Sequence, residues 1–365
     1  MKKVLWLTNI PSPYRVAFFN ELGKKCELTV LFEKAFSDER NDQWKTYNYS
    51  HFKGLVLPSK SIDVDKAFSC SMIKYINQYK NDIIIVSNPA TPTGILSIFF
   101  MILFKIPYII ESDGAFPKAP RGIKGFVKCV MYSRAKACFT TSELGKEYFI
   151  LNHVKKEDIY LYPFTSVSRS DIPDCLSKEQ RREIRYELKM EEEFIVISVG
   201  RFIESKGFDI LLEAARLIND KSIGVYIVGD KPTNGFLAFC QVNELCNVHF
   251  VDFMPSEELK KWYLSADLFV LPTRTDVWGL VINEAMSCGL PVITTTMCVA
   301  GTEMINHKNG KLIEIDNPEL LALSIKEILS RKDICQMGIN SREVASKYTI
   351  EEMSERHIYL FNLLY

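Results

Sequence analysis

The sequence predicts an α/β protein of two domains, each built around a doubly wound parallel sheet. Short apolar runs alternate with segments of helical periodicity along both halves of the chain. Periodicity is lost between Pro163 and Leu176, where Pro, Ser, Thr and Asp dominate, and the alternation restarts at Phe194. A chain of 365 residues also has the usual length of two domains.

In the first half, apolar runs of strand length are separated by helical segments. We expect strands at Val4–Thr8, Leu28–Phe32, Gly54–Leu57, Ile83–Ser87, Tyr108–Glu111, Ala137–Thr141 and Ile159–Tyr162. Ligands of such sheets bind beyond the carboxyl ends of the strands. The loops at 9–15, 87–93 and 112–121 are therefore the ones that we expect to matter.

Two of these loops carry candidate functional residues. The loop NIPSPYR (9–15) has no GxGxxG pattern and ends on Arg15, which either lies near an anion or is only solvated. In the loop after the strand at 108–111, Asp113 is well placed to bond a substrate hydroxyl, and Gly114 allows close backbone approach. An Asx-type turn is the alternative at Asp113.

The second half repeats the pattern and ends in three helices. After a polar helix at 177–189, strands are expected at 194–199, 225–228 and 248–250, and helices at 207–219, 256–265, 318–330, 334–347 and 349–365. The last helix is apolar at Met353, Ile358, Leu360 and Phe361, so it must pack on another element. We expect an N-terminal domain at 1–165, a linker and connecting helix at 166–192, a second domain at 193–347, and a C-terminal helix at 348–365 that crosses back to the first domain.

Charge and cysteine content narrow the function classes. The chain has 45 Lys and Arg against 45 Asp and Glu, but residues 1–165 carry 23 against 15, a net charge of +8. This excess suggests a face for an anionic lipid or a phosphorylated acceptor, unless it is simple drift in composition. The ten cysteines show no CxxC or His-x-Cys spacing, which indicates reduced thiols in a cytosolic setting rather than a disulfide frame or zinc site.

Three segments bear on membranes. Met1 to Lys3 leads directly into a strand, so we expect no signal peptide. Gly94–Phe104 covers only about half of a bilayer core, which favours a buried crossover helix. The segment Lys118–Lys136 is basic, with interleaved apolar residues and no acid between Asp113 and Glu143. It can lie on an anionic membrane surface or be an ordinary surface helix, whereas no nucleic-acid motif is present.

The stretch Ala266–Thr294 has the pattern strand, loop, helix, strand. Asp276 precedes the predicted helix and Glu284 lies within it. Between them, amides around Trp278, Gly279 and Leu280 stand at a helix N-terminus, where anions are stabilised. A βαβ unit with a solvated carboxylate is the alternative.

A second motif opens the second domain. In GRFIESKG (200–207), Arg201 can chelate phosphate oxygens through its planar fork and Lys206 supplies a point charge. The loop is not a Walker motif, since GxxxxGK[ST] is absent. A capped helix with surface cations is the alternative.

Together, GRFIESKG and DVWGLVINEAMSCGLPVIT (276–294) resemble the retaining glycosyltransferases of family 4. These enzymes have the GT-B fold, in which two Rossmann-like domains face a central cleft. The resemblance covers essentially residues 2–360 and is specific in the C-terminal half. The opening NIPSPYRVAFFNEL is also similar to a subgroup that assembles bacterial surface polysaccharides.

The resemblance implies a role for each motif residue. Glu284 matches the acid that holds the nucleotide ribose, and Asp276 matches the acid that contacts the donor sugar. Arg201 and Lys206 match the pair that neutralises the departing diphosphate, and Asp113 falls where many members carry a His near the acceptor. Amides near the donor phosphates are implied at Trp278, Gly279, Leu280 and Val281.

Two departures from the family pattern stand in this sequence. Most members carry Glu where this chain has Asp276, so its carboxylate reaches one methylene less far. The usual Gly-rich first loop is replaced by Pro-Ser-Pro-Tyr-Arg, which leaves the contacts of Arg15, on the acceptor or phosphate side, open.

The resemblance implies transfer of a hexose or N-acetylhexosamine from a nucleotide sugar, with UDP favoured, to a saccharide or polyprenyl-diphosphate-linked acceptor. Asp113, Arg201, Lys206 and Asp276 are the expected catalytic residues. No metal or other cofactor is expected, because cations and amides can stabilise the diphosphate. We expect a cytoplasmic protein, peripheral on the inner face of the membrane. A GT-B UDP-sugar epimerase and a non-catalytic nucleotide-sugar-binding scaffold are the alternatives.

Overall fold

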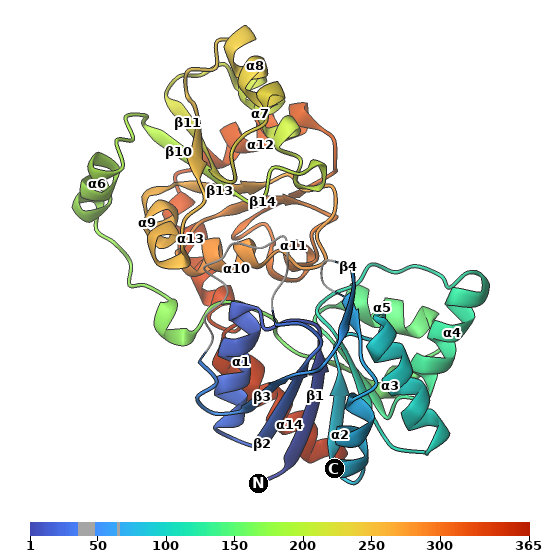
Figure 1. The fold of residues 1–365 in the computed structure, drawn as a ribbon. Coiled ribbons are helices and arrows are strands. Elements are labelled where there is room, and N and C mark those ends of the chain that lie inside the picture. The colour runs from blue at the N-terminus through green and yellow to red at the C-terminus, as the bar shows by residue number, and fades with distance from the viewer. Residues whose placement is uncertain (36–47, 64–65) are drawn as a thin grey trace. The chain divides into compact units, whose positions relative to one another are not determined.

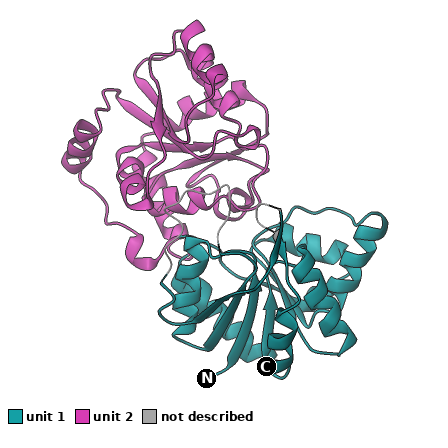
Figure 2. Ribbon diagram, in the orientation of Figure 1, with its two compact units in different colours: residues 1–166, 349–365 teal, residues 167–348 magenta. Residues whose placement is uncertain are grey.

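A computed structural model describes residues 1–35, 48–63 and 66–365 and divides them into two compact units (Figure 2). Unit 1 contains residues 1–166 together with 349–365, and unit 2 contains residues 167–348. The segment 167–192, expected to be a linker and connecting helix, therefore belongs to unit 2. Each unit holds a parallel sheet between layers of helices, which confirms the predicted fold class.

Unit 1 is built on a seven-stranded sheet with the order β3-β2-β1-β6-β7-β8-β9 (Figure 1). All neighbouring strands are parallel. The strands are β1 (Lys3–Thr8), β2 (Glu27–Phe32), β3 (Lys53–Val56), β6 (Ile83–Val86), β7 (Ile109–Ser112), β8 (Ala137–Thr140) and β9 (Ile159–Leu161). The strand order reverses between β1 and β6, which is where ligands bind in sheets of this kind.

Helices cover both faces of this sheet, which explains why its strands are apolar at nearly every position. Along β1, Leu5 and Leu7 pack toward helices α2 to α5, while Trp6 faces the other side and contacts Phe18 of α1 and His357 of α14. The helices are α1 (Pro13–Gly23), α2 (Met72–Gln78), α3 (Pro92–Leu103), α4 (Gly122–Ser133), α5 (Glu143–Leu151) and α14 (Ile350–Leu364). The C-terminal helix α14 lies against α1, with Leu360 and Phe361 completely buried.

A small antiparallel hairpin was not expected from the sequence. Strands β4 (Lys60–Asp63) and β5 (Lys66–Phe68) pair with each other outside the main sheet. Buried Glu33, directly after β2, accepts a hydrogen bond from the backbone N–H of Ala67 in β5 at 3.3 Å. This bond ties the hairpin to the carboxyl end of the sheet.

Unit 2 is built on a six-stranded parallel sheet with the order β12-β11-β10-β13-β14-β15. Its strands are β10 (Phe194–Val199), β11 (Ile223–Gly229), β12 (Val248–Asp252), β13 (Leu268–Leu271), β14 (Val292–Thr295) and β15 (Gly310–Ile313). Its helices are α6 (Lys178–Glu187), α7 (Phe208–Ile218), α8 (Asn234–Val242), α9 (Ser256–Ser265), α10 (Leu280–Ser287), α11 (Val299–Met304), α12 (Pro318–Leu329) and α13 (Ile334–Ala345). Helices α7 and α12 pack together over one face, and α8, α11 and β15 were not predicted.

The prediction that residues 94–104 form a buried crossover helix is correct only for one side of α3. Ile98 and Met101 are completely buried in the core of unit 1. Leu103 and Phe104 at its C-terminal end are 75% and 60% exposed. No helix among the described residues is both long and apolar enough to span a bilayer.

Candidate active site

Sheet topology explains why the two motifs of unit 2 come together. The order of the sheet reverses between β10 and β13, so the loops that leave the carboxyl ends of these neighbouring strands lie side by side. The loop after β10 carries Arg201 and Lys206, and the loop after β13 carries Asp276. The candidate donor-side site is therefore at the switch point of this sheet.

Lys206 and Asp276 form an ion pair across these two loops. The Lys206 Nζ lies 2.6 Å from Asp276 Oδ2, and the side chains are only 18% and 15% exposed. The other carboxylate oxygen of Asp276 accepts a hydrogen bond from the backbone N–H of Trp278 at 3.4 Å. The shortened acid is thus held in place by a cation and an amide, with lone pairs left over for a ligand.

The start of α10 presents backbone N–H groups beside this pair. Gly279 adopts φ 97°, and a Cβ built there would lie 2.8 Å from Cys298 Sγ, so only glycine fits. The Trp278 side chain is buried and donates from Nε1 to Asn283 at 2.8 Å, which fixes the turn. Amides of the first helical turn, at Leu280 and Val281, have no intrahelical acceptor and can receive an anion.

Glu284 lies one turn into α10 and is half-buried. Its Oε2 accepts a hydrogen bond from the buried Tyr263 hydroxyl of α9 at 3.2 Å. Burial raises the pKa of Tyr263 far above its usual range, and the nearby Glu284 adds to the rise, so this hydroxyl remains a donor. Tyr263 was not identified from the sequence, since a Tyr among apolar helix positions is normally core.

Arg201 follows β10 by two residues and has an exposed side chain. The backbone of its loop is closed by hydrogen bonds from Ile203 N–H to the Arg201 carbonyl at 2.8 Å and from Lys206 N–H to the Ile203 carbonyl at 2.9 Å. The loop after β10 therefore carries two cations, Arg201 and Lys206.

In unit 1, Asp113 lies just past the end of β7 with its side chain 32% exposed. Arg15 of α1 donates to Asp113 through Nη2 and to Glu111 through Nη1, the latter at 2.7 Å. The hydroxyl of Tyr162 donates to Glu111 at 2.9 Å and lies 3.4 Å from Asp113. Gly114 follows with φ 147°, and its carbonyl accepts from Ser112 Oγ at 3.1 Å.

The structure places Arg15 in the core rather than at an anion-facing surface. Its side chain is 4% exposed, and its guanidinium is paired with Glu111, which is completely buried, and with Asp113. The guanidinium also lies 5.5 Å from the centroid of the Phe164 ring. Arg15 thus holds the carboxylate of Asp113 in place from within the core, and its guanidinium is not accessible to a phosphate.

A buried histidine completes this cluster. His357 of α14 is fully buried, its Nε2 lies 3.8 Å from Glu111 Oε2, and Nδ1 bonds the Met353 carbonyl at 2.7 Å. Glu111, Tyr162 and His357 were not assigned roles from the sequence. Glu111 at the end of an otherwise apolar strand is the signal that could have found this cluster.

Burial and neighbouring charges together move the pKa values of the two carboxyl groups of this cluster in opposite directions. Burial raises the pKa of Asp113 to about 6; the Arg15 charge opposes the rise and Glu111 adds to it. Burial also disfavours the Glu111 carboxylate, but Arg15 and His357 outweigh it and hold the pKa of Glu111 below its usual range. Glu111 is therefore the permanent anion, and Asp113 is the group that can exchange a proton near neutral pH.

No group of three or more His, Cys, Asp and Glu side chains within residues 1–35, 48–63 and 66–365 is arranged to hold a metal ion. Ten free cysteines are spread over both units, and none of them forms a disulfide.

Comparison with known proteins bears on both units. Residues 179–351 match the family described as glycosyl transferases group 1. An uncharacterised glycosyltransferase of Methanocaldococcus jannaschii is 27% identical over 315 residues, which covers 78% of this chain and 86% of that protein. The capsular polysaccharide biosynthesis glycosyltransferase CapM of Staphylococcus aureus is 23% identical over 304 residues, covering 80% of each protein.

The fold of the whole chain is also found among solved structures. HepE of Anabaena, solved in complex with UDP, is similar with a TM-score of 0.78 over the full length of both chains at 16% identity. The matched family and both sequence relatives are described as glycosyltransferases, so epimerisation, the enzymatic alternative, is not favoured. The chain is thus similar to glycosyltransferases over most of its length, its residues 179–351 match group 1, and its fold is GT-B.

Proposed function

We propose that the protein transfers a hexosyl or N-acetylhexosaminyl group from a UDP-sugar, with retention of configuration, to a saccharide or lipid-linked acceptor of a surface polysaccharide. The observation that carries this proposal is the Lys206–Asp276 pair beside the first turn of α10. It brings a cation, a carboxylate and helix amides to one edge of the sheet, as a sugar diphosphate requires. HepE binds UDP, and CapM is named for capsular polysaccharide biosynthesis, which supports the donor and the product class.

Charge stabilisation supplies the catalysis in this proposal. Breaking the sugar–phosphate bond builds negative charge on the leaving diphosphate and positive charge on the sugar ring. Lys206, Arg201 and the amides of Leu280 and Val281 stabilise the diphosphate, so no divalent metal is required. In this proposal, Asp276 stabilises or orients the sugar.

The remaining site residues bind the other parts of the substrates. Glu284, fixed by Tyr263, accepts hydrogen bonds from the ribose hydroxyls. Asp113 orients the acceptor hydroxyl, and as a carboxylate above pH 6 or so it can also take up its proton. Gly114 leaves room for the acceptor next to the backbone.

Donor choice and chemistry are tested with one panel. UDP-, GDP-, ADP- and dTDP-sugars are incubated with the protein, and slow hydrolysis and transfer to oligosaccharide acceptors are followed by NMR, which also reports the anomeric configuration. We expect turnover of a UDP-sugar with retention, unaffected by EDTA. Lys206→Ala and Glu284→Gln should lose at least tenfold in kcat/KM, while Glu257→Gln, at an exposed position of α9, serves as the matched control. A new free nucleotide sugar as the product would favour epimerisation and contradict the proposal.

We also propose that unit 1 docks on an anionic membrane surface. Helix α4 exposes Ile123 and Phe126, at 82% and 69%, and helix α3, which contacts α4, exposes Leu103 and Phe104 at its C-terminal end. Exposed cations accompany these apolar side chains, namely Lys105, Lys118, Arg121 and Lys124. By contrast, Met131 and Tyr132, which the sequence suggested as part of this surface, are buried in the core.

Apolar side chains among cations match the interface of an anionic bilayer. We expect sedimentation with vesicles of phosphatidylglycerol and phosphatidylcholine, weakened by salt and by the change Ile123→Ser with Phe126→Ser. Val242→Ser, which alters an 81% exposed apolar residue on α8, is the control. Equal binding to neutral vesicles, or no binding at low salt, would contradict membrane docking.

A further inference from the structure

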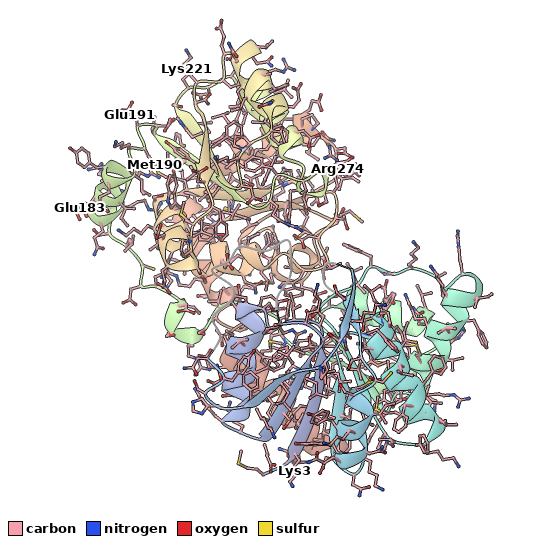
Figure 3. All side chains as sticks on the ribbon, viewed as in Figure 1. Lys3, Glu183, Met190, Glu191, Lys221 and Arg274 are labelled. Atoms are coloured by element: carbon pink, nitrogen blue, oxygen red, sulfur yellow. The ribbon has the colours of Figure 1, made fainter. Side chains whose placement is uncertain are left out.

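Arg274 lies in the loop after β13, two residues before Asp276, and its guanidinium reaches three separate segments. Nη1 and Nη2 form a bidentate pair with Asp209 at the start of α7, at 2.9 and 2.6 Å. Nη1 also donates to the Glu204 carbonyl at 2.7 Å, and Nε donates to Asp316 at 2.6 Å. Arg274 is labelled on unit 2 in Figure 3.

The backbone around Arg274 is joined to the same turn. Its N–H donates to the Ser205 carbonyl at 2.8 Å, and Thr273 Oγ1 donates to that carbonyl at 2.6 Å. A Cβ on Gly207 would lie 2.1 Å from the Pro272 carbonyl oxygen, so the two loops touch there without room for a side chain. The turn at 204–207 and the loop at 272–276 therefore form one connected surface.

We infer that Arg274 is a positioning residue that sets the distance between Lys206 and Asp276. The inference rests on the proposed function, because it assigns to these two residues the diphosphate and the sugar of the donor. Glu204 and Ser205, which Arg274 and Thr273 bind, directly precede Lys206, while Arg274 itself is two residues from Asp276. Any shift of the guanidinium therefore moves the cation and the carboxylate apart.

Arg274 acts through these contacts and not as a phosphate ligand. Its four hydrogen bonds, made through all three guanidinium nitrogens, go to Asp209, Asp316 and the Glu204 carbonyl, and a guanidinium has five N–H donors in all. The neighbouring carboxylates hold the pKa of Arg274 above its already high usual value, so the guanidinium keeps its charge at every working pH. A lysine keeps the charge but cannot span the two acids and the carbonyl with a planar fork.

The test compares Arg274→Lys with Arg331→Lys. Arg331 makes a similar bidentate pair with Asp333, at 2.8 and 2.7 Å, on the surface of unit 2. UDP affinity is measured by calorimetry, donor turnover by steady-state kinetics, and loop order by hydrogen exchange of peptides covering 200–207. We expect Arg331→Lys to behave as the wild type in all three.

For Arg274→Lys we expect kcat/KM to fall about 10- to 100-fold, mainly in kcat, because Lys206 stabilises charge that develops in the transition state. UDP should bind up to about tenfold more weakly, and amides at 200–207 should exchange faster while those of β11 do not change. Asp209→Asn removes the charge of the partner of Arg274. This second variant should show the same fall in kcat/KM and the same faster exchange at 200–207. Unchanged UDP affinity, exchange and kcat in Arg274→Lys would overturn the inference.

Failure of the proposed function has a different signature. If the wild type neither binds UDP nor turns over any nucleotide sugar, the proposed function is wrong. Faster exchange at 200–207 in Arg274→Lys, with no change in Arg331→Lys, would then still support the link between the two loops, and equal exchange would refute it.

Discussion

Replacing Arg15 by Met is the sharpest test of the buried cluster behind Asp113. Arg15 is 4% exposed and Glu111 is 0% exposed, so removing the guanidinium leaves a carboxylate in the core of unit 1 with only His357, at 3.8 Å, beside it. Breaking a buried ion pair from one side costs about 3–5 kcal/mol. If Arg15 were instead a surface cation that binds a phosphate, its removal would cost less than about 1 kcal/mol of stability.

The double variant Arg15→Met with Glu111→Gln shows whether charge or packing causes the loss of stability. Removing both charges eliminates the uncompensated carboxylate, so most of the lost stability should return. Tyr162 can still donate to the amide oxygen that the second change introduces at position 111. If the double variant is as unstable as Arg15→Met, packing of the long side chain, rather than charge, is the cause.

Native-state hydrogen exchange measures the effect in each unit separately. Peptides from β1 and β7 report unit 1, and peptides from β10 and β13 report unit 2 and act as the internal control. A loss of about 3 kcal/mol corresponds to an increase of about 100-fold in exchange through global opening of unit 1. A change of less than about fivefold in unit 1, or an equal change in both units, would refute the buried-pair reasoning.

Three further outcomes follow from the structure. With Asp113 ionising at a pKa of about 6, kcat/KM should fall as the pH drops through 6, and Asp113→Asn should abolish that limb; a profile that stays flat in the wild type contradicts the role of Asp113. Burial raises the pKa of Glu33 to about 7, against hydrogen bonds from Thr91, Ala67 and Asn88, so protonation is favoured in the folded state. Stability of unit 1 should therefore decline as the pH rises from 4.5 to about 7, by at most about 1.4 kcal/mol per pH unit, and urea titration of Glu33→Gln should lack this decline. Gly207→Ala places a Cβ 2.1 Å from the Pro272 carbonyl oxygen at φ 67°, so unit 2 should lose about 1–3 kcal/mol by thermal unfolding, whereas Gly235→Ala, where the nearest atom is 3.7 Å away, should not.

The sequence was sufficient to predict every strand of the two sheets except β15. Strands of a parallel sheet are buried on both faces, so β6 and β13 appear as uninterrupted apolar runs of strand length, and β10 is interrupted only by Ser198. The hairpin β4–β5 did not stand out, because its strands are only four and three residues long and lie outside the two main sheets. Helix α3 was misjudged at its end because composition alone does not say which apolar side chains face solvent.

The candidate site, too, was only partly predictable from the sequence. The motifs at 200–207 and 276–294 identified Arg201, Lys206, Asp276 and Glu284 as candidates, and their assigned roles stay predictions. The reversal of strand order between β10 and β13 makes these loops neighbours, and this order is not readable from a single strand.

Residue type and spacing alone predicted a two-domain α/β protein with an anion-binding helix N-terminus after Gly279. Only the tertiary structure decided that Arg15 is a buried support, that His357 from the last helix faces Glu111, and that Arg274 links two loops. Local periodicity records how much of a side chain is buried. Which distant charges meet depends on strand order and helix packing, and those are properties of the folded chain as a whole.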